Sequence, residues 1–357
     1  MSNYKSIRVP INHVIPGMEL AKPVLTDEGK IALSEGTYLN AGLIIRLKHW
    51  GIMSLDIREL APDDAEERNK PSHSQQKFYS DYDKTVDTVK KSFQLIRDSN
   101  TVPFEECQKL VDKDMELILE SPGVINHLHM VNRQGDEYTF HHSVNVAVVA
   151  GVLGKWLEYD QNEINNLMLA GLLHDIGKVK VPLKIVNKPA KLSVAEMEIM
   201  KQHTIYGYRL IRDIPNISQK LLLAVLQHHE RMDGCGYPFQ IKGDRIHPYA
   251  RIIAIADMYD AMTSDRVYQP KTTPFTVVEM IVKEMFNKLD PAICTIFLNN
   301  VRDYFIGNVV QLSDGREAEV VYVGQFVASR PVVRTQAGEF IDLEKRKELS
   351  VVKLIEA

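Results

Sequence analysis

The chain has 357 residues, a formal net charge of −4, 45% hydrophobic residues and 25% charged residues, as expected for a globular protein of two or three domains. This balance excludes a general binder of nucleic-acid polymers or membrane surfaces, because such proteins carry a basic footprint. No apolar run is long enough to span a bilayer, and the first residues lack the apolar core of a signal peptide. The three cysteines are too few and too far apart for a disulfide framework, so we expect a cytoplasmic, reducing location.

The first 60 residues alternate short apolar segments with turn signals such as IPGM, TDEGK and LSEGT. This pattern predicts a small β-rich domain over residues 1–60, with one amphipathic helix, AGLIIRLKHWG, that Gly51 ends. Residues 61–77 are polar and charged and contain almost no large apolar side chains. That composition is typical of a solvated linker.

Helical periodicity dominates residues 78–304. The segment DKTVDTVKKSFQLIRD places apolar side chains about 3.6 residues apart, and similar segments follow it, so we expect a bundle of at least seven helices. Residues 305–357 predict a β extension with two hairpins, NVVQLSDGREAEVVYVG with an Asp-Gly turn and RPVVRTQAGEFIDL. The predicted fold class is mainly α, with a helical bundle core, a β-rich N-terminal domain and a C-terminal β extension.

Five of the predicted helices carry histidine or aspartate at an apolar segment that a bundle would turn inward. A carboxylate such as Asp257, inside IIAIADMYDAM, is costly to bury unless a cation or strong donors meet it. Helical bundles build metal sites from side chains on facing helices. The candidate ligands are His142, His174, Asp175, His203, His228, His229 and Asp257.

The pair His174 and Asp175, in LLHDIGK, also has a simpler explanation. The pair could merely cap the apolar helix before it, with Gly177 closing the C-terminus of that helix. Taken alone, a His-Asp pair is common by chance, so its weight depends on the rest of the set.

The other histidines also allow alternatives. His203 by itself would more often be a core histidine than a ligand, although Gly207, one turn later, would let another segment approach closely. His141 is the alternative to His142 and would lie on a different face of the same helix. The metal hypothesis therefore depends on the whole set occurring together.

The donor types narrow the choice of metal. Imidazole and carboxylate together suit iron, manganese or zinc, and the absence of cysteine ligands argues against a structural zinc. Seven ligands are too many for one catalytic ion that keeps an open position, so we expect two ions, with Asp175 bridging them through its two oxygens. A two-metal centre holds a hydroxide and draws charge from a phosphoryl oxygen, as in-line attack on a phosphodiester requires.

Several ordered motifs give residues 135–290 a family resemblance. LLHDIGK resembles the signature of the HD superfamily of metal-dependent phosphohydrolases, and HHERMDGCGYP resembles the second signature of its HD-GYP branch. The segments VPLKIVNKPAKLSVAEMEIMKQHTIYG and ARIIAIADMYDAMTSDRVY are also similar to that branch. The resemblance implies an HD-type fold and a phosphodiesterase that hydrolyses cyclic di-GMP, a bacterial second messenger, to pGpG or GMP. It also implies iron or manganese, with iron as the first choice.

The resemblance implies roles for individual residues. The seven candidate ligands would hold the two ions, and Asp175 and Lys178 would act in catalysis. Lysine supplies a point charge for phosphate, and arginine supplies a two-pronged contact. The substrate-binding residues that the resemblance implies are Lys178, Arg266, Gly236, Tyr237 and Pro238.

Two positions depart from the family pattern. Some members have a glutamate that serves a third metal, but this chain has Tyr138 there, and Glu137 lies one step off the required face. We therefore expect two metals. A basic residue usually follows the tyrosine of DRxY, but this chain has Gln269, with Lys271 two residues later. One phosphate contact is therefore missing, unless Lys271 replaces it.

Two other functions stay open at this point. One is a phosphodiesterase for another cyclic dinucleotide, such as cyclic GMP-AMP. The other is a catalytically weak module that binds a cyclic dinucleotide and signals through protein contacts, because Gln269 would slow cleavage. The partners we expect are cyclic di-GMP, proteins that contact the Gly236–Pro238 loop or the N-terminal domain, and a second copy of the chain. We expect neither a nucleic-acid polymer nor a membrane as a partner.

Overall fold

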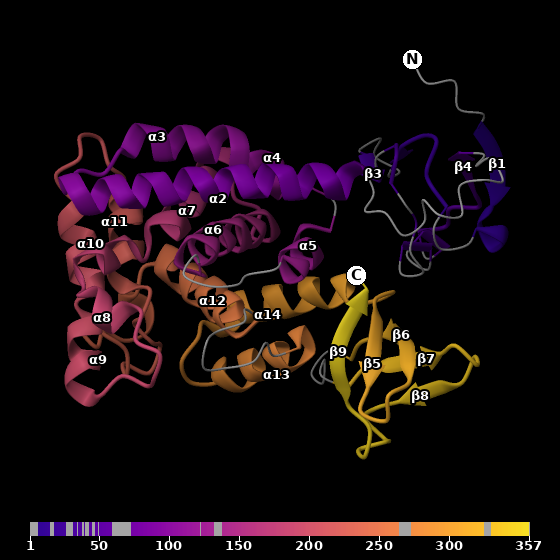
Figure 1. Cartoon of the computed structure of the whole chain (residues 1–357). Coiled ribbons are helices and arrows are strands. Elements are labelled where there is room, and N and C mark those ends of the chain that lie inside the picture. Colours follow the sequence, from indigo (N-terminus) through magenta and orange to yellow (C-terminus); the bar gives the residue numbers. More distant parts are fainter. Residues whose placement is uncertain are drawn as a thin grey trace. The chain divides into compact units, whose positions relative to one another are not determined.

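The computed structural model in Figure 1 divides into two units. Unit 1 comprises Met1–Ser80, Ser121–His127 and Arg302–Ala357, and unit 2 comprises Asp81–Glu120 and Leu128–Val301. The predicted boundaries at residues 60, 77 and 304 stay a prediction. The residues that the structure describes are 6–14, 18–25, 31–33, 35–37, 39, 43–44, 47–48, 50–58, 73–121, 123–131, 138–263, 273–324 and 330–356.

The N-terminal part of unit 1 is β-rich, as predicted. Strands β1 and β4 pair antiparallel, as do β2 and β3. Side chains in β4 alternate in burial, so Leu55 and Ile57 point into an apolar cluster that also contains Val9, Leu20 and Leu39. The elements of this part are β1 (Ser6–Pro10), the 3-10 turn η1 (Ile11–His13), β2 (Val24–Leu25), β3 (Ile31–Leu33) and β4 (Ser54–Arg58).

Part of the predicted helix over residues 41–51 lies outside the described residues, but its end is described. Gly51 has a φ of +73°, and its N–H donates to the carbonyl of Lys48. The N–H of Ile52 donates to the carbonyl of Leu47, which completes the usual glycine-terminated helix end. The role predicted for Gly51 is confirmed. The predicted linker over 61–77 lies outside the described residues up to position 72, and a helix begins at His73.

The C-terminal part of unit 1 is a five-stranded antiparallel sheet in the order β8-β7-β6-β5-β9, drawn in orange to yellow in Figure 1. Both predicted hairpins are present, with Gly315 and Gly338 at positive φ in their turns. Alternate side chains, such as Val310 and Val333, are buried. The strands are β5 (Val309–Leu312), β6 (Glu317–Tyr322), β7 (Val332–Thr335), β8 (Phe340–Asp342) and β9 (Val351–Glu356).

Unit 2 is a helical bundle, which confirms the predicted fold class. The long helix α2 (His73–Ser99) begins in unit 1 and continues into unit 2. The other helical elements of the chain are α3 (Phe104–Lys109), the π-helical turn η3 (Leu110–Met115), α4 (Glu116–Leu119), α5 (Val124–Met130), α6 (Tyr138–Trp156), α7 (Gln161–Leu173), the 3-10 turn η4 (Ile176–Lys180), α8 (Leu183–Val186), α9 (Val194–Lys201), α10 (His203–Ile211), α11 (Gln219–Gln227), the 3-10 turn η5 (Gly243–Arg245), α12 (Pro248–Thr263), α13 (Pro274–Glu284), α14 (Pro291–Val301) and the 3-10 turn η6 (Arg302–Tyr304).

Helix α6 forms the centre of unit 2. Every residue from His142 to Gly154 is buried, because the helix is apolar on all sides and packs against α7, α12 and α14. Gly171 lets α6 and α7 approach closely, since a Cβ there would lie 2.7 Å from the Cα of Ala147. Among the helices within the described ranges, none is long and apolar enough to cross a membrane.

A second close approach involves Gly177 and Gly207. A Cβ on Gly177 would lie 1.9 Å from the carbonyl oxygen of His203 and 2.4 Å from the backbone nitrogen of Gly207. The predicted close approach at Gly207 is therefore confirmed, and the approaching segment is η4. The prediction that Gly177 closes the preceding helix is wrong. This residue lies inside η4, where the missing side chain makes room for α10.

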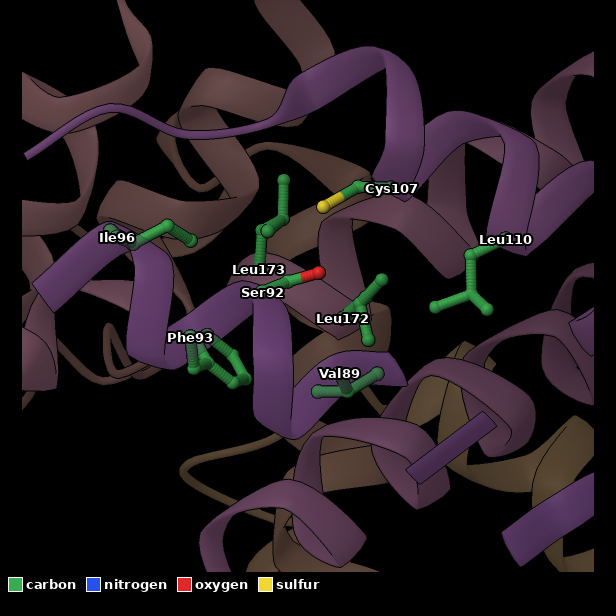
Figure 2. A pocket seen from close by; sticks show the side chains of 8 residues that line it. All are labelled: Val89, Ser92, Phe93, Ile96, Cys107, Leu110, Leu172 and Leu173. Atoms are coloured by element: carbon green, nitrogen blue, oxygen red, sulfur yellow. The ribbon is translucent and has the colours of Figure 1, made fainter. Parts of the chain in front are cut away.

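A small apolar pocket lies beside α2 (Figure 2). Its lining includes Ser92 and Cys107 among aliphatic and aromatic side chains, and burial raises the pKa of the Cys107 thiol to about 12. Leu172 and Leu173, which precede the predicted ligand His174, also line the pocket. Side chains from α2 and from the end of α7, just before two of the predicted ligands, therefore line the same pocket.

Candidate metal centre

The structure brings all seven predicted ligands together in unit 2. Their donor atoms form two groups, and within each group they lie within 4.8 Å of one another. One group is Asp175, His203, His228 and His229, and the other is His142, His174 and Asp257. His142 lies in α6, His174 and Asp175 follow α7, His203 begins α10, His228 and His229 follow α11, and Asp257 lies in α12.

Asp175 lies between the two groups and presents a different oxygen to each. Its Oδ1 is 3.3 Å from Nε2 of His203 and 4.0 Å from Nε2 of His228. Its Oδ2 is 3.3 Å from Nε2 of His174 and 3.6 Å from Nε2 of His142. This arrangement is the one that a bridging carboxylate needs, with one oxygen available to each of two cations.

Three of the histidines are oriented by the last turn of the helix that precedes each of them. The Nδ1 atoms of His174, His203 and His228 lie 2.6, 2.7 and 2.9 Å from the carbonyl oxygen three residues earlier. An Nδ1–H that donates to a carbonyl leaves the lone pair on Nε2, the atom that faces Asp175 in each case. The accepting carbonyls belong to Gly171, Met200 and Val225.

His142 is oriented by side chains instead. Its Nδ1 is 2.7 Å from Oδ2 of Asp260, and its Nε2 is 3.2 Å from Oδ1 of Asp257. Asn145 donates from Nδ2 to the other oxygen of Asp260 at 2.7 Å. The ring of His141 stacks on Tyr82, with 5.7 Å between the ring centroids, and is not part of either ligand group.

The sequence analysis missed Asp260 and Asn145. The signal that could have found them is spacing on a helix, because Asp260 follows Asp257 by three residues and Asn145 follows His142 by three. Residues three apart share a helix face, so a polar residue at that distance from a buried ligand is placed to support it.

Burial and neighbouring charges set the protonation of the cluster. Burial and nearby imidazoles hold the pKa of His228 and His229 well below the usual value, and burial lowers that of His203 to about 4. Burial disfavours the ionised form of Asp175, but Lys178 and His174 hold its pKa well below the usual value. These histidines are therefore neutral and this carboxylate ionised at neutral pH, which is the state a ligand set requires.

His142 behaves differently from these histidines. Burial opposes a charge on its imidazole, but hydrogen bonds with Asp257 and Asp260 raise its pKa to about 9. The carboxylate of Asp257 is disfavoured by burial, yet its hydrogen bond with His142 holds its pKa well below the usual value. Two carboxylates thus surround this imidazole, and a bound cation would balance their negative charge in place of the proton.

The cluster fits divalent cations by a second criterion. Among the described side chains, Nε2 of His174 and Oδ1 of Asp175 are buried without a hydrogen-bond partner. A buried polar atom left in this way is costly unless another group satisfies it. Both residues belong to the two ligand groups, whose nitrogen and oxygen donors suit iron, manganese or zinc.

The loop after His229 folds back onto the ligands. Buried Glu230 accepts hydrogen bonds from the backbone N–H of Phe239 at 2.7 Å and of Ile241 at 3.2 Å. Gly236 permits this path, since a Cβ there would lie 2.5 Å from the carbonyl oxygen of His229. The ring of Tyr237 then lies 4.6 Å from the His229 ring, between centroids. The glutamate, to which the sequence analysis gave no role, therefore holds the loop.

Of the other residues that the sequence analysis singled out, the structure describes some and leaves others outside its described ranges. The Nζ atom of Lys178 contacts Oδ2 of Asp175, and Pro238 follows Tyr237 through a cis peptide bond. Arg266, Gln269 and Lys271 lie outside the described residues. Tyr138 stacks on the His142 ring, with 5.5 Å between centroids and 15° between planes. An aromatic ring thus covers the side of His142 on which a third-metal glutamate was considered.

Comparison with known proteins agrees with this arrangement. A family model described as an HD domain matches residues 122–293. The chain is 35% identical over 228 residues to cyclic di-GMP phosphodiesterase PA4108 of Pseudomonas aeruginosa, covering 64% of this chain and 55% of that protein. It is 33% identical over 178 residues to 3'3'-cGAMP-specific phosphodiesterase 2 of Vibrio cholerae, covering 48% and 33%. The chain spans about half the length of the curated relatives it matches first.

Similarity to a solved structure supports the fold. The HDG"Y"P protein Bd1817 of Bdellovibrio bacteriovorus superposes with a TM-score of 0.54 at 15% identity, covering 84% of this chain and all of that one. The histidine and aspartate cluster, the Gly236–Pro238 loop and the matched HD domain all fall in the same part of the sequence. Residues 122–293 thus match an HD domain, and this part of the chain is similar to cyclic di-GMP phosphodiesterases.

Proposed function

We propose that the chain is a phosphodiesterase that hydrolyses cyclic di-GMP to pGpG or GMP, with two transition-metal ions, iron or manganese. One observation carries the proposal, namely that the two oxygens of Asp175 face separate groups of histidine and aspartate ligands. The names of the relatives support the substrate, because several of them are cyclic di-GMP phosphodiesterases.

In such a site, each group of side chains would hold one of the two ions. Asp175, His203, His228 and His229 would hold one ion, and His142, His174, Asp257 and the second oxygen of Asp175 would hold the other. When bound, the two metals supply Lewis acidity, which activates a water molecule and draws charge from a phosphoryl oxygen. The neutral histidines leave their lone pairs free for the metals, and the ionised carboxylates offset the metals' positive charge.

Lys178 is placed to meet the substrate. Its Nζ contacts Asp175, while 27% of its side chain is exposed. A lysine in this position can direct its charge either to the carboxylate or to a phosphate oxygen that enters the site. Arg266 is proposed to make the second phosphate contact. Tyr237, packed against His229, would form one wall of the substrate pocket.

The test combines metal analysis with a product assay. Protein purified anaerobically should contain about two transition-metal ions per chain and cleave cyclic di-GMP, as a two-metal site requires. Asp175→Ala should lose both metal and activity, because it removes an oxygen from each ligand group. Asp213→Ala serves as the matched control, since Asp213 is exposed and pairs with its neighbour Arg212 at 3.3 Å. Normal turnover by Asp175→Ala would disprove the mechanism.

A second substrate is supported by a specific observation. Relatives named as specific for cyclic GMP-AMP reach 33% identity to this chain, close to the 35% of the first cyclic di-GMP relative. Comparing the turnover of both dinucleotides by the same metal-loaded protein would distinguish the two activities.

A module that binds a cyclic dinucleotide without cleaving it is tested by single-turnover assays with iron and with manganese. Such a module would retain the nucleotide uncleaved in both assays. Protein partners at the Gly236–Pro238 loop, a homodimer and a cytoplasmic location stay predictions.

A further inference from the structure

We propose that Tyr82, on α2, is a positioning residue for the metal centre and acts through Asn145 and Asp260 on the imidazole of His142. The inference rests on the proposed metal centre and adds to it a residue from a helix that carries none of the ligands.

Three successive hydrogen bonds connect Tyr82 to the ligand. The Tyr82 hydroxyl donates to Oδ1 of Asn145 at 2.8 Å, and Nδ2 of Asn145 donates to Oδ1 of Asp260 at 2.7 Å. The other oxygen of Asp260 lies 2.7 Å from Nδ1 of His142. An Nδ1–H that donates to this carboxylate leaves Nε2 of His142 free to bind a metal.

His142 depends on this support because its Nδ1 faces the side chain of Asp260 instead of a backbone carbonyl. The Nδ1 atoms of the other three histidines that face Asp175 lie against backbone carbonyls three residues earlier, and α-helical geometry holds those carbonyls in place. Asp260 is a side chain and can rotate. Asn145 holds its second oxygen and so helps to fix the carboxylate.

The amide of Asn145 requires a partner in turn. Its nitrogen must face Asp260, because a half-turn of the amide would place Oδ1 against the carboxylate, two acceptors facing each other. The hydroxyl donor of Tyr82 binds Oδ1 and favours the required orientation. A single hydroxyl group on α2 therefore helps to select the orientation of two further polar side chains and, through them, that of the His142 ring.

Burial gives this chain of contacts its strength. Tyr82 and Asn145 are completely buried, and Asp260 and His142 are 2% and 3% exposed. Bulk water therefore has little access to replace a missing bond, and a broken member leaves a buried polar atom unsatisfied.

The test is Tyr82→Phe, which removes the hydroxyl and, with it, a 3.1 Å contact to Nδ1 of His141, and keeps the ring that stacks on His141. The dissociation constant of Mn²⁺ is measured on metal-free protein by competition with a chromophoric chelator. Loss of a group that supports a metal ligand typically weakens metal affinity by at least about tenfold, and we expect that change.

Tyr249→Phe is the matched control. Tyr249 is 2% exposed, and its hydroxyl contacts the Glu163 side chain in a different part of unit 2. The control loses a buried hydroxyl without interrupting the contacts to His142. Its Mn²⁺ affinity should stay within about twofold of wild type, as expected for a site with no shared partners.

A spectroscopic measurement distinguishes a changed ligand geometry at the metal from a general loss of protein stability. The visible absorption of bound Co²⁺ depends on ligand geometry, so Tyr82→Phe should change the spectrum and Tyr249→Phe should not. Asn145→Ala tests the same contacts independently and should weaken Mn²⁺ binding at least as much. The double variant Tyr82→Phe/Asn145→Ala should be no weaker than Asn145→Ala, because the path is already broken.

The outcomes distinguish the inference from the function on which it rests. If Tyr82→Phe matches Tyr249→Phe in both affinity and spectrum, the positioning role is overturned while the metal centre stands. If wild-type protein itself binds no Mn²⁺, Co²⁺ or iron, the proposed metal centre is overturned, and the inference with it.

Discussion

The close contact between η4 and α10 yields the sharpest stability prediction, through the variant Gly177→Ala. The added Cβ would lie 1.9 Å from the carbonyl oxygen of His203 and 2.4 Å from the backbone nitrogen of Gly207. Both are backbone atoms, so no change of rotamer relieves the overlap. To reach an ordinary contact of 3.4 Å, the His203 carbonyl must move by about 1.5 Å.

Such a movement has two consequences. Overpacking a buried site where backbones cross lowers the free energy of unfolding by about 3 kcal/mol. For a cooperative unit of this size, that loss corresponds to a fall in Tm of about 6–12 °C. The same movement displaces His203, whose Nε2 lies 3.3 Å from Asp175. Metal affinity should therefore fall as well, by at least about tenfold.

The assay is calorimetry of metal-free protein, followed by Mn²⁺ titration against a chelator. Gly324→Ala is the control, because a Cβ there would meet no atom within 4 Å and the backbone does not have a positive φ. That substitution should leave Tm unchanged or slightly higher, since alanine restricts the unfolded chain. If Gly177→Ala unfolds within about 1 °C of the control and binds Mn²⁺ equally well, the argument from the backbone crossing is refuted.

Two further predictions concern buried polar side chains. Glu230→Gln should lose about 1–3 kcal/mol of unfolding free energy, because Phe239 and Ile241 donate to different oxygens of Glu230 and the amide replaces one oxygen with a donor. Chemical denaturation measures this loss, and equal stability of the exposed control Glu198→Gln would contradict it. His127 is buried, and burial lowers its pKa to about 4, so the unfolded chain, with a pKa near 6.5, takes up the proton first. Its stabilising contribution should therefore disappear as pH falls from 6.5 towards 4. Relative to His127→Phe, wild type should lose about 2–3 kcal/mol between pH 7.5 and 4.5, and parallel stability curves would rule this out.

Local sequence patterns predicted much of the fold. Glycines at Gly51, Gly315 and Gly338 adopt positive φ where a helix end and two hairpin turns need it, because few other residues enter that region cheaply. The apolar periodicity of the central segments likewise predicted the bundle. The segment VAEMEIMKQHTIYGYRLI is divided at Gln202 into α9 and α10, which periodicity alone does not reveal.

Gly177 shows where this reasoning failed. A glycine after an apolar helix usually closes it, so the local pattern favoured a helix end. The actual requirement comes from His203, more than twenty residues later, whose carbonyl occupies the space a side chain would need. A contact so distant in sequence leaves no local pattern.

The sequence by itself determined which side chains could bind metal, because buried histidines and aspartates are costly on apolar helices unless something meets them. It also indicated that Asp175 could bridge two ions, because a carboxylate has two oxygens. Only the tertiary structure decided that His142 and not His141 joins the ligands, and that Asp260 supports it. The physical reason is that chemical type is a local property, whereas the direction and partners of a side chain depend on how distant helices pack.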